Sequence, residues 1–162
     1  MKQDTNQRQI AGCNFLNQSP TTISRIINRE VLISFPVGIP AFEDAKYYTL
    51  VSDDSTKPFI CLNSADIPGL GFVCIDPFLF FSTYAVNLSG KDLSLLGLSK
   101  PDEALVLSLV TIYPDPKQTT ANLRAPIVVN IRNLFASQVI LERYPVNFNI
   151  WTGLNEEASQ EI

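Results

Sequence analysis

Residues 104–113, ALVLSLVTIY, form the longest apolar stretch of the chain. A strand with alternating apolar and polar residues buries one face, whereas an almost unbroken apolar run predicts a strand that is buried on both faces. The run is well short of the roughly 20 residues that a membrane helix needs, so we predict no membrane span. We therefore place residues 104–113 at the centre of a sheet.

Shorter runs rich in Val, Ile, Phe, Tyr and Thr flank this stretch, and Pro, Gly, Asp and Asn separate them, as is typical of strands and turns. The other predicted strands cover residues 22–28, 31–35, 47–52, 59–63, 71–75, 83–88, 127–132 and 136–142. Short strands at this density predict an all-β, mainly antiparallel fold, a small β-barrel-like domain with one or two short helices.

Side-chain alternation is clear in two of these strands. In each, alternate residues form an apolar face: Tyr84, Val86 and Leu88 in one, and Ile127, Val129 and Ile131 in the other. Asn130 and Arg132 are expected to point away from the core. Both strands are therefore predicted to be half-buried.

One short helix has recognisable ends. Ser89 is placed to cap its first turn, and Asp92 stands at the acidic position of a capping box. Leu93 and Leu96 share a face at i,i+3, and Gly97 ends the helix. We expect this helix to cover an open end of the barrel, and a further helical turn to lie around residues 42–46.

Both ends of the chain are polar. Residues 1–20 are rich in Gln and Asn, which predicts a flexible N-terminal extension, and residues 152–162 predict a flexible acidic tail. The barrel domain is expected to span residues 21–151, and the length of 162 residues suits a single domain.

The composition excludes several classes of function. The chain has no histidine, which removes Ser-His and Cys-His nucleophile pairs and histidine metal ligands. Its net charge is -4 and its basic residues are dispersed, so direct nucleic-acid binding is disfavoured. Cys13, Cys61 and Cys74 form no C-x-x-C motif and no signal-peptide pattern follows Met1, which predicts a reduced, cytoplasmic protein with Cys61 and Cys74 as buried apolar residues.

Acid–base chemistry or cation binding would fall to carboxylates: Glu43 with Asp44, Asp53 with Asp54, Asp66 and Asp76. Adjacent residues on a strand face opposite sides, and Asp favours turns because its side chain bonds the local backbone. The structural interpretation is favoured, so we expect no catalytic residue, no metal and no cofactor.

Two segments are unusual for a purely structural domain. DPFLFF at 76–81 holds three phenylalanines in four residues, which lie on opposite faces if the segment is extended. The rings either fill the core, which the area of each ring favours, or anchor a protein partner. TTANLRAP at 119–126 leads into a strand through Pro126, and its Asn122 and Arg124 serve the turn or contact a partner.

Several collinear segments between residues 21 and 145, taken together, resemble the flagellar assembly factor FliW family. They are FPVGIPAFED at 35–44, FICLNSADIPGLGFVCIDPFLFF at 59–81, LSGKDLSLLGL at 88–98, TTANLRAPIVVNI at 119–131 and SQVILE at 137–142. The sequence departs from the family pattern at a few positions: Ala41, where Gly is frequent, Asn63, where Gln is usual, Ile67, usually acidic, and Arg124, usually apolar.

The resemblance implies a non-enzymatic, β-barrel-like regulator that binds CsrA, an RNA-binding translational repressor, and antagonises its binding to flagellin mRNA. It alternatively binds flagellin, so the two partners must weaken each other by the same coupling free energy. An acidic chain suits a basic RNA-binding partner. The implied contact candidates are Phe78, Phe80, Phe81, Asn122, Arg124 and Asn130, whereas Pro36, Gly38 and Pro40 are expected to shape a turn.

Without the resemblance, two other classes of function stay open. A small antiparallel barrel can hold an apolar ligand, which a large closed cavity would favour. An enzyme with paired carboxylates would hold them roughly 5 to 10 Å apart across a cleft.

Overall fold

The computed structural model describes residues 14–15, 18 and 20–152. The strands are β1 (Asn14–Phe15), β2 (Ile33–Ser34), β3 (Tyr47–Val51), β4 (Ile60–Ser64), β5 (Gly71–Ile75), β6 (Val86–Asn87), β7 (Ala104–Thr111), β8 (Thr120–Ala121), β9 (Ile127–Asn130), β10 (Ala136–Gln138) and β11 (Phe148–Asn149). The helices are α2 (Pro20–Ser24) and α3 (Gly90–Leu96), with 3-10 turns η1 (Pro77–Leu79), η2 (Pro101–Glu103) and η3 (Pro116–Gln118). The predicted all-β class is confirmed. Within the described part of the chain, no helix is long and apolar enough to cross a bilayer.

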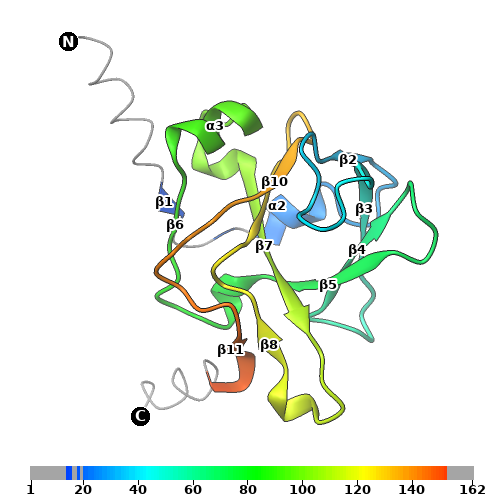
Figure 1. The fold of residues 1–162 in the computed structure, drawn as a ribbon, viewed down its shortest axis with the longest axis vertical. Helices are drawn as coiled ribbons and strands as arrows, with labels where there is room; N and C mark the ends of the chain where they lie inside the picture. Colours follow the sequence, from blue (N-terminus) through cyan, green and yellow to red (C-terminus); the bar gives the residue numbers. More distant parts are fainter. Residues whose placement is uncertain (1–13, 16–17, 19, 153–162) are drawn as a thin grey trace.

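Most strands form one curled antiparallel sheet in the order β10-β9-β7-β5-β4-β3-β2, with β8 pairing both β7 and β11 (Figure 1). The two edges of the sheet approach each other where Ser34 forms a parallel bridge with Phe135. The backbone N–H of Ser34 donates to the carbonyl oxygen of Leu134 at 2.8 Å. A single bridge is not a ladder, so the sheet is barrel-like without closing into a barrel.

The strand β7 separates two hydrophobic cores. Leu105 and Leu107 belong to the core inside the curled sheet, whereas Ala104 and Val106 belong to a second core that includes residues of α3. The predicted burial on both faces is confirmed for residues 104–108 and is wrong for residues 111–113, which are exposed where the strand runs out beyond the two cores. Large, fully buried side chains fill the interior of the curled sheet: Ile33, Phe35, Tyr48, Leu50, Leu62, Leu105 and Leu107.

The helix α3 begins and ends as predicted. The Ser89 hydroxyl accepts a hydrogen bond from the Asp92 N–H, and the Asp92 carboxylate accepts one from the Ser89 N–H. Gly97 is left-handed, with φ of 65°. The expected position at a barrel end is wrong: Leu93 and Leu96 pack into the second core, because the sheet interior is already filled.

Residues 22–28 are not a strand, which corrects the prediction. Here α2 is followed by a turn, and the Ile27 N–H donates to the Ile23 carbonyl at 3.0 Å. The apolar residues Ile23, Ile26 and Ile27 follow the i, i+3, i+4 spacing of a helix, and Pro20 suits a first helical turn. Helical periodicity therefore outweighs the β-branched composition of this segment.

Several other predicted strands are shorter than expected, and β1, β8 and β11 were not predicted because two residues are too few to show an alternation. The prediction that β9 is half-buried is wrong. Its four residues are all buried, because the second core covers the face that carries Val128 and Asn130. Residues 39–45 form tight turns instead of a helical turn.

The segment before α2 contacts the sheet where it is described. β1 pairs with β6, and the side-chain amide of Gln18 bonds both the N–H and the carbonyl of Val106, each at 2.8 Å. Residues 1–13, 16–17, 19 and 153–162 lie outside the described residues. The predicted N-terminal extension, the acidic tail and the domain limits therefore stay predictions.

Candidate functional site

The DPFLFF segment, which lies between two predicted strands, is a turn and not an extended segment. The Asp76 carboxylate accepts a hydrogen bond from the Phe78 N–H at 2.9 Å, and Pro77 occupies the first position of η1. The turn buries Phe80 at 5% exposure and leaves Leu79 57% exposed. Leu79, which was not a candidate in the sequence, is therefore the most exposed apolar side chain of this segment.

Phe78 and Phe81 join an aromatic cluster at the edge of the second core. Phe81 stacks on Phe148 with ring centroids 5.0 Å apart, and the Tyr84 and Tyr144 rings are 4.6 Å apart. The Phe78 ring lies 5.6 Å from Tyr84. Burial is the first cause that raises the pKa of the Tyr84 hydroxyl. The favoured interpretation, that these rings complete the core, fits this placement.

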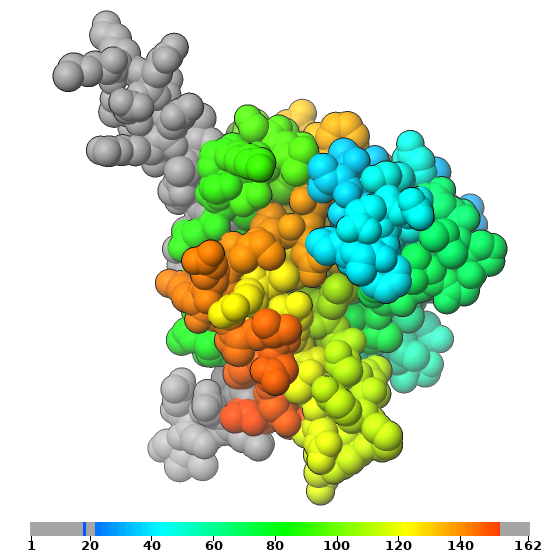
Figure 2. Space-filling view, in the orientation of Figure 1, coloured from blue at the N-terminus to red at the C-terminus, as the bar shows by residue number. Residues whose placement is uncertain are grey.

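Asn122 and Arg124 organise the segment that leads into β9. The Asn122 side-chain carbonyl accepts from the Ala125 N–H at 3.0 Å. The exposed Arg124 guanidinium donates to the backbone carbonyls of Tyr144 and Glu142, each at 3.0 Å. Figure 2 shows this segment, in yellow, beside the orange C-terminal segment on one face of the molecule. The structure thus places Arg124 next to the backbone of the aromatic cluster.

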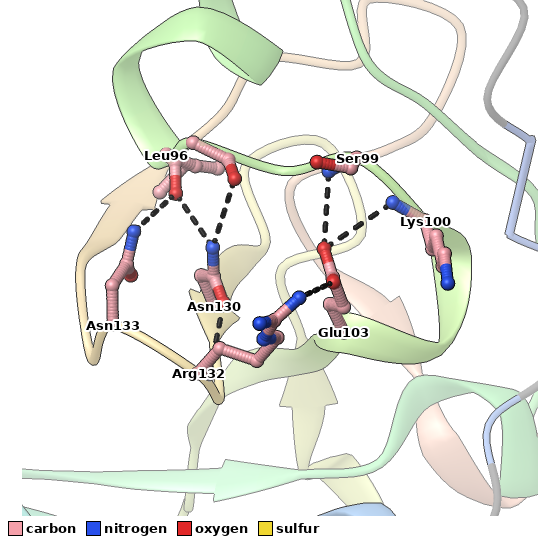
Figure 3. A network of polar contacts seen from close by, with 8 residues as sticks. Leu96, Ser99, Lys100, Glu103, Asn130, Arg132 and Asn133 are labelled. Carbon is pink, nitrogen blue, oxygen red and sulfur yellow. Dashed lines mark hydrogen bonds and ion pairs between the residues drawn. The ribbon is translucent and has the colours of Figure 1, made fainter.

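Asn130 lies apart from the other candidates, at the end of α3 (Figure 3). Its side-chain amide donates to the carbonyls of Leu96 at 2.8 Å and Gly97 at 3.3 Å, and its carbonyl accepts from the Arg132 N–H. Asn130 is only 2% exposed. It satisfies carbonyls that the helix end leaves without intrahelical partners.

A buried carboxylate, Glu103, joins the same region and was not singled out in the sequence. It accepts hydrogen bonds from the Arg132 guanidinium at 2.8 Å and from the N–H groups of Ser99 and Lys100 (Figure 3). The bond from Arg132 is the first cause that lowers the pKa of Glu103. Arg132 follows Glu103 by 29 residues, so no local pattern predicts the pair.

Three of the other carboxylates that the sequence offered bond backbone or side-chain groups near them: Asp53, Asp54 and Asp66. Asp53 accepts from the Ser55 N–H at 2.6 Å, and Asp54 lies 2.8 Å from the Lys57 ammonium. Asp66 accepts from the backbone N–H groups of Lys46 and Tyr47. No group of three or more acidic or cysteine side chains in the described ranges is arranged to hold a metal ion.

The two described cysteines differ in burial. Cys74 is fully buried, and burial raises the pKa of its thiol to about 12, whereas Cys61 is only half-buried. The predicted burial is confirmed for Cys74 and is wrong for Cys61. Cys13 lies outside the described residues.

A groove of about 630 Å³ lies between α2, the turn at residues 52–58 and η1. Its apolar lining consists of Ile23, Ile27, Pro58, Ile60 and Leu79. Its polar lining consists of Gln18, Ser24, Asn28, Ser52, Asp53, Asp54, Lys57 and Asp76. Burial is the first cause that raises the pKa of Asp76. The groove combines segments far apart in the sequence. Its carboxylates Asp53, Asp54 and Asp76 and the motif that holds Leu79 were conspicuous in the sequence, but nothing there indicated that they meet.

Comparison with known proteins gives consistent matches. A family model, described as FliW protein, matches residues 19–150. The chain is 35% identical over 147 residues to the flagellar assembly factor FliW of Treponema pallidum, covering 89% of this chain and 97% of the relative. It is 38% identical over 111 residues to the flagellar assembly factor FliW of Clostridium botulinum, covering 68% of this chain and 79% of the relative. A crystal structure of the flagellar assembly factor FliW superposes with a TM-score of 0.68 at 34% identity, covering 75% of this chain and 84% of that chain.

Proposed function

Because the chain belongs to the FliW family of flagellar assembly factors, we propose that it is a non-enzymatic regulator that binds a CsrA-type RNA-binding repressor and, alternatively, flagellin. The family match over residues 19–150 carries this proposal. In the cytoplasm, the chain withdraws the repressor from flagellin mRNA. Accumulating flagellin occupies the chain and frees the repressor, and secretion of flagellin reverses the switch.

The charge of the chain supports a basic protein partner. The net charge is -4, and a repressor that binds RNA must present clustered Lys and Arg to neutralise phosphates. Complementary charge raises the association rate and makes it sensitive to salt. The full sequence has no histidine, and Asp53, Asp54 and Asp66 bond their local surroundings, which supports a role without covalent chemistry.

A partner switch requires the two binding events to be antagonistic. If flagellin weakens repressor binding by a given factor, the repressor weakens flagellin binding by the same factor. A hundredfold antagonism corresponds to a coupling free energy of about 2.7 kcal/mol. The two partners therefore need either overlapping surfaces or a shared element that each fixes differently.

The six contact candidates enter the proposal in two ways. Arg124 is exposed, and Phe78, Phe81 and Asn122 are partly exposed, so these side chains can touch a partner. The two buried candidates would act by holding the neighbouring surface in place: Phe80 and Asn130.

The experiment is an isothermal titration of the purified chain with the cognate CsrA-type repressor, repeated after saturation with flagellin. We expect binding to the repressor that flagellin greatly weakens. A titration with an unrelated basic protein is the control for non-specific charge attraction. Absence of binding to both the repressor and flagellin would contradict the proposal.

A further inference from the structure

The groove between α2 and η1 has the size and lining of a site for protruding side chains. Its volume of about 630 Å³ lies within the range of small-ligand pockets. Leu79 contributes an aliphatic side chain that is 57% exposed, next to Ile23 and Ile27, which are partly exposed. Covering these side chains removes apolar surface from water, which favours an apolar occupant.

The turn that carries Leu79 is fixed before any partner arrives. The Asp76 carboxylate holds the Phe78 N–H, and the Phe81 N–H donates to the Pro77 carbonyl at 3.0 Å. Pro77 and Phe80, on either side of Leu79, are buried and anchor the turn. Little ordering of Leu79 is therefore needed on binding, and preorganisation of this kind favours affinity.

The charge of the lining selects the occupant. The described lining residues carry three carboxylates, those of Asp53, Asp54 and Asp76, against the single ammonium of Lys57. The Lys57 ammonium lies 2.8 Å from Asp54, so these two charges compensate each other, and Asp53 and Asp76 keep the lining negative. A negative, partly apolar groove favours an apolar segment with adjacent positive charge.

We propose that this groove holds a segment of the CsrA-type repressor in which an aliphatic side chain stands beside a Lys or Arg. The inference rests on the proposed function, because it takes the repressor as the occupant. The aliphatic side chain contacts Leu79 and the α2 isoleucines, and the basic residue faces the carboxylates of Asp53 and Asp54. Of the two proposed partners, the RNA-binding repressor is the one whose activity requires clustered positive charge.

The test compares Leu79→Glu with Ile140→Glu in the full chain. Both side chains are exposed, at 57% and 62%, but Ile140 does not line the groove. Each variant is titrated with the repressor and with flagellin, and its thermal unfolding is recorded. We expect Leu79→Glu to raise the Kd for the repressor by about tenfold or more, because it introduces a charge into a contact centre. Ile140→Glu should leave both Kd values within about twofold of the wild type.

A second pair tests the charge. Asp54→Lys reverses a groove carboxylate, and Asp44→Lys makes the same change at an exposed position outside the groove. We expect only Asp54→Lys to weaken repressor binding and to reduce its dependence on salt concentration.

The outcomes separate the groove from the proposed function. A wild-type chain that binds neither protein overturns the proposed function and the groove occupant together. A wild-type chain that binds the repressor while Leu79→Glu binds it equally well overturns only the groove. The occupant is assigned wrongly if Leu79→Glu loses flagellin binding alone. It is also assigned wrongly if the groove binds a small apolar ligand in place of the repressor segment.

Discussion

At the scale of single residues, Tyr48 shows how a core tolerates a polar atom. Its side chain is fully buried, and its hydroxyl has no hydrogen-bond partner among the described residues. Burial is the first cause that raises the pKa of this hydroxyl. We expect Tyr48→Phe to increase the free energy of unfolding by up to about 1 kcal/mol, because the ring contacts remain and the unpaired hydroxyl is removed.

The matched control for Tyr48 is Tyr84→Phe, measured by urea denaturation alongside it. The Tyr84 hydroxyl donates to the Leu123 carbonyl at 2.7 Å, so its removal should cost about 1 kcal/mol. Equal losses in the two variants would show that the Tyr48 hydroxyl has a partner after all.

Asn130 has two proposed roles, one in holding the end of α3 and one in contacting a partner. A variant at this position distinguishes them. Asn130→Ala removes the donors to the Leu96 and Gly97 carbonyls, so we expect a loss of about 1–3 kcal/mol in the free energy of unfolding. Thermal unfolding and repressor titration are measured together. A weakened titration with an unchanged melting temperature would instead assign Asn130 to direct contact with the partner.

At the scale of elements, the turn at residues 36–45 depends on two left-handed positions. Gly38 has φ of 74°, and a Cβ there would lie 2.6 Å from the Glu43 Cα. We expect Gly38→Ala to cost about 2 kcal/mol or more, from the left-handed backbone and the clash. Ala41 has φ of 73°, a conformation that glycine adopts without strain, so Ala41→Gly should be neutral or stabilise by up to about 1 kcal/mol. Chemical denaturation measures both, and a loss in Ala41→Gly would refute the strain argument.

The link between η2 and the turn after β9 should depend on pH. The Arg132 guanidinium and two backbone N–H groups favour ionised Glu103, which lowers its pKa below the ordinary 4.5. A lowered pKa in the folded state stabilises the protein above the ordinary pKa, and this contribution is lost as pH falls through the folded value. Glu103→Gln should therefore lower the melting temperature at neutral pH. The difference from the wild type should shrink as the pH falls below 4.5 and through the lowered pKa of the folded state, and a difference that grows toward acid would contradict the assignment.

At the scale of the whole molecule, β7 joins two cores into one folding unit. Leu107 lies in the core inside the curled sheet, and Val106 lies in the second core. We expect Leu107→Ala to cost about 2–5 kcal/mol and Val106→Ala somewhat less, because each leaves a cavity in a buried core. Calorimetry should show one cooperative transition in each case, whereas two separate transitions would mean that the cores unfold independently.

The sequence could predict features that depend on neighbouring residues. The apolar run of β7 and the Ser89, Asp92 and Gly97 caps of α3 carry their own physical causes within a few residues. The second core, the pairing of Glu103 with Arg132 and the groove combine distant segments, and no local pattern encodes which segments meet. The DPFLFF motif falls between these cases, because its residues are conspicuous while its turn depends on the Asp76 cap.

The side chain of Gln18 acts as a one-residue substitute for a strand. Its amide bonds both backbone groups of Val106, on the central strand β7. The family match begins at residue 19, one position later. A shortened chain that begins there would leave the N–H and the carbonyl of buried Val106 without these partners, and an unpaired buried backbone group costs about 1–3 kcal/mol. We therefore expect a chain cut at the limit of the family match to unfold at a lower temperature than one that keeps Gln18.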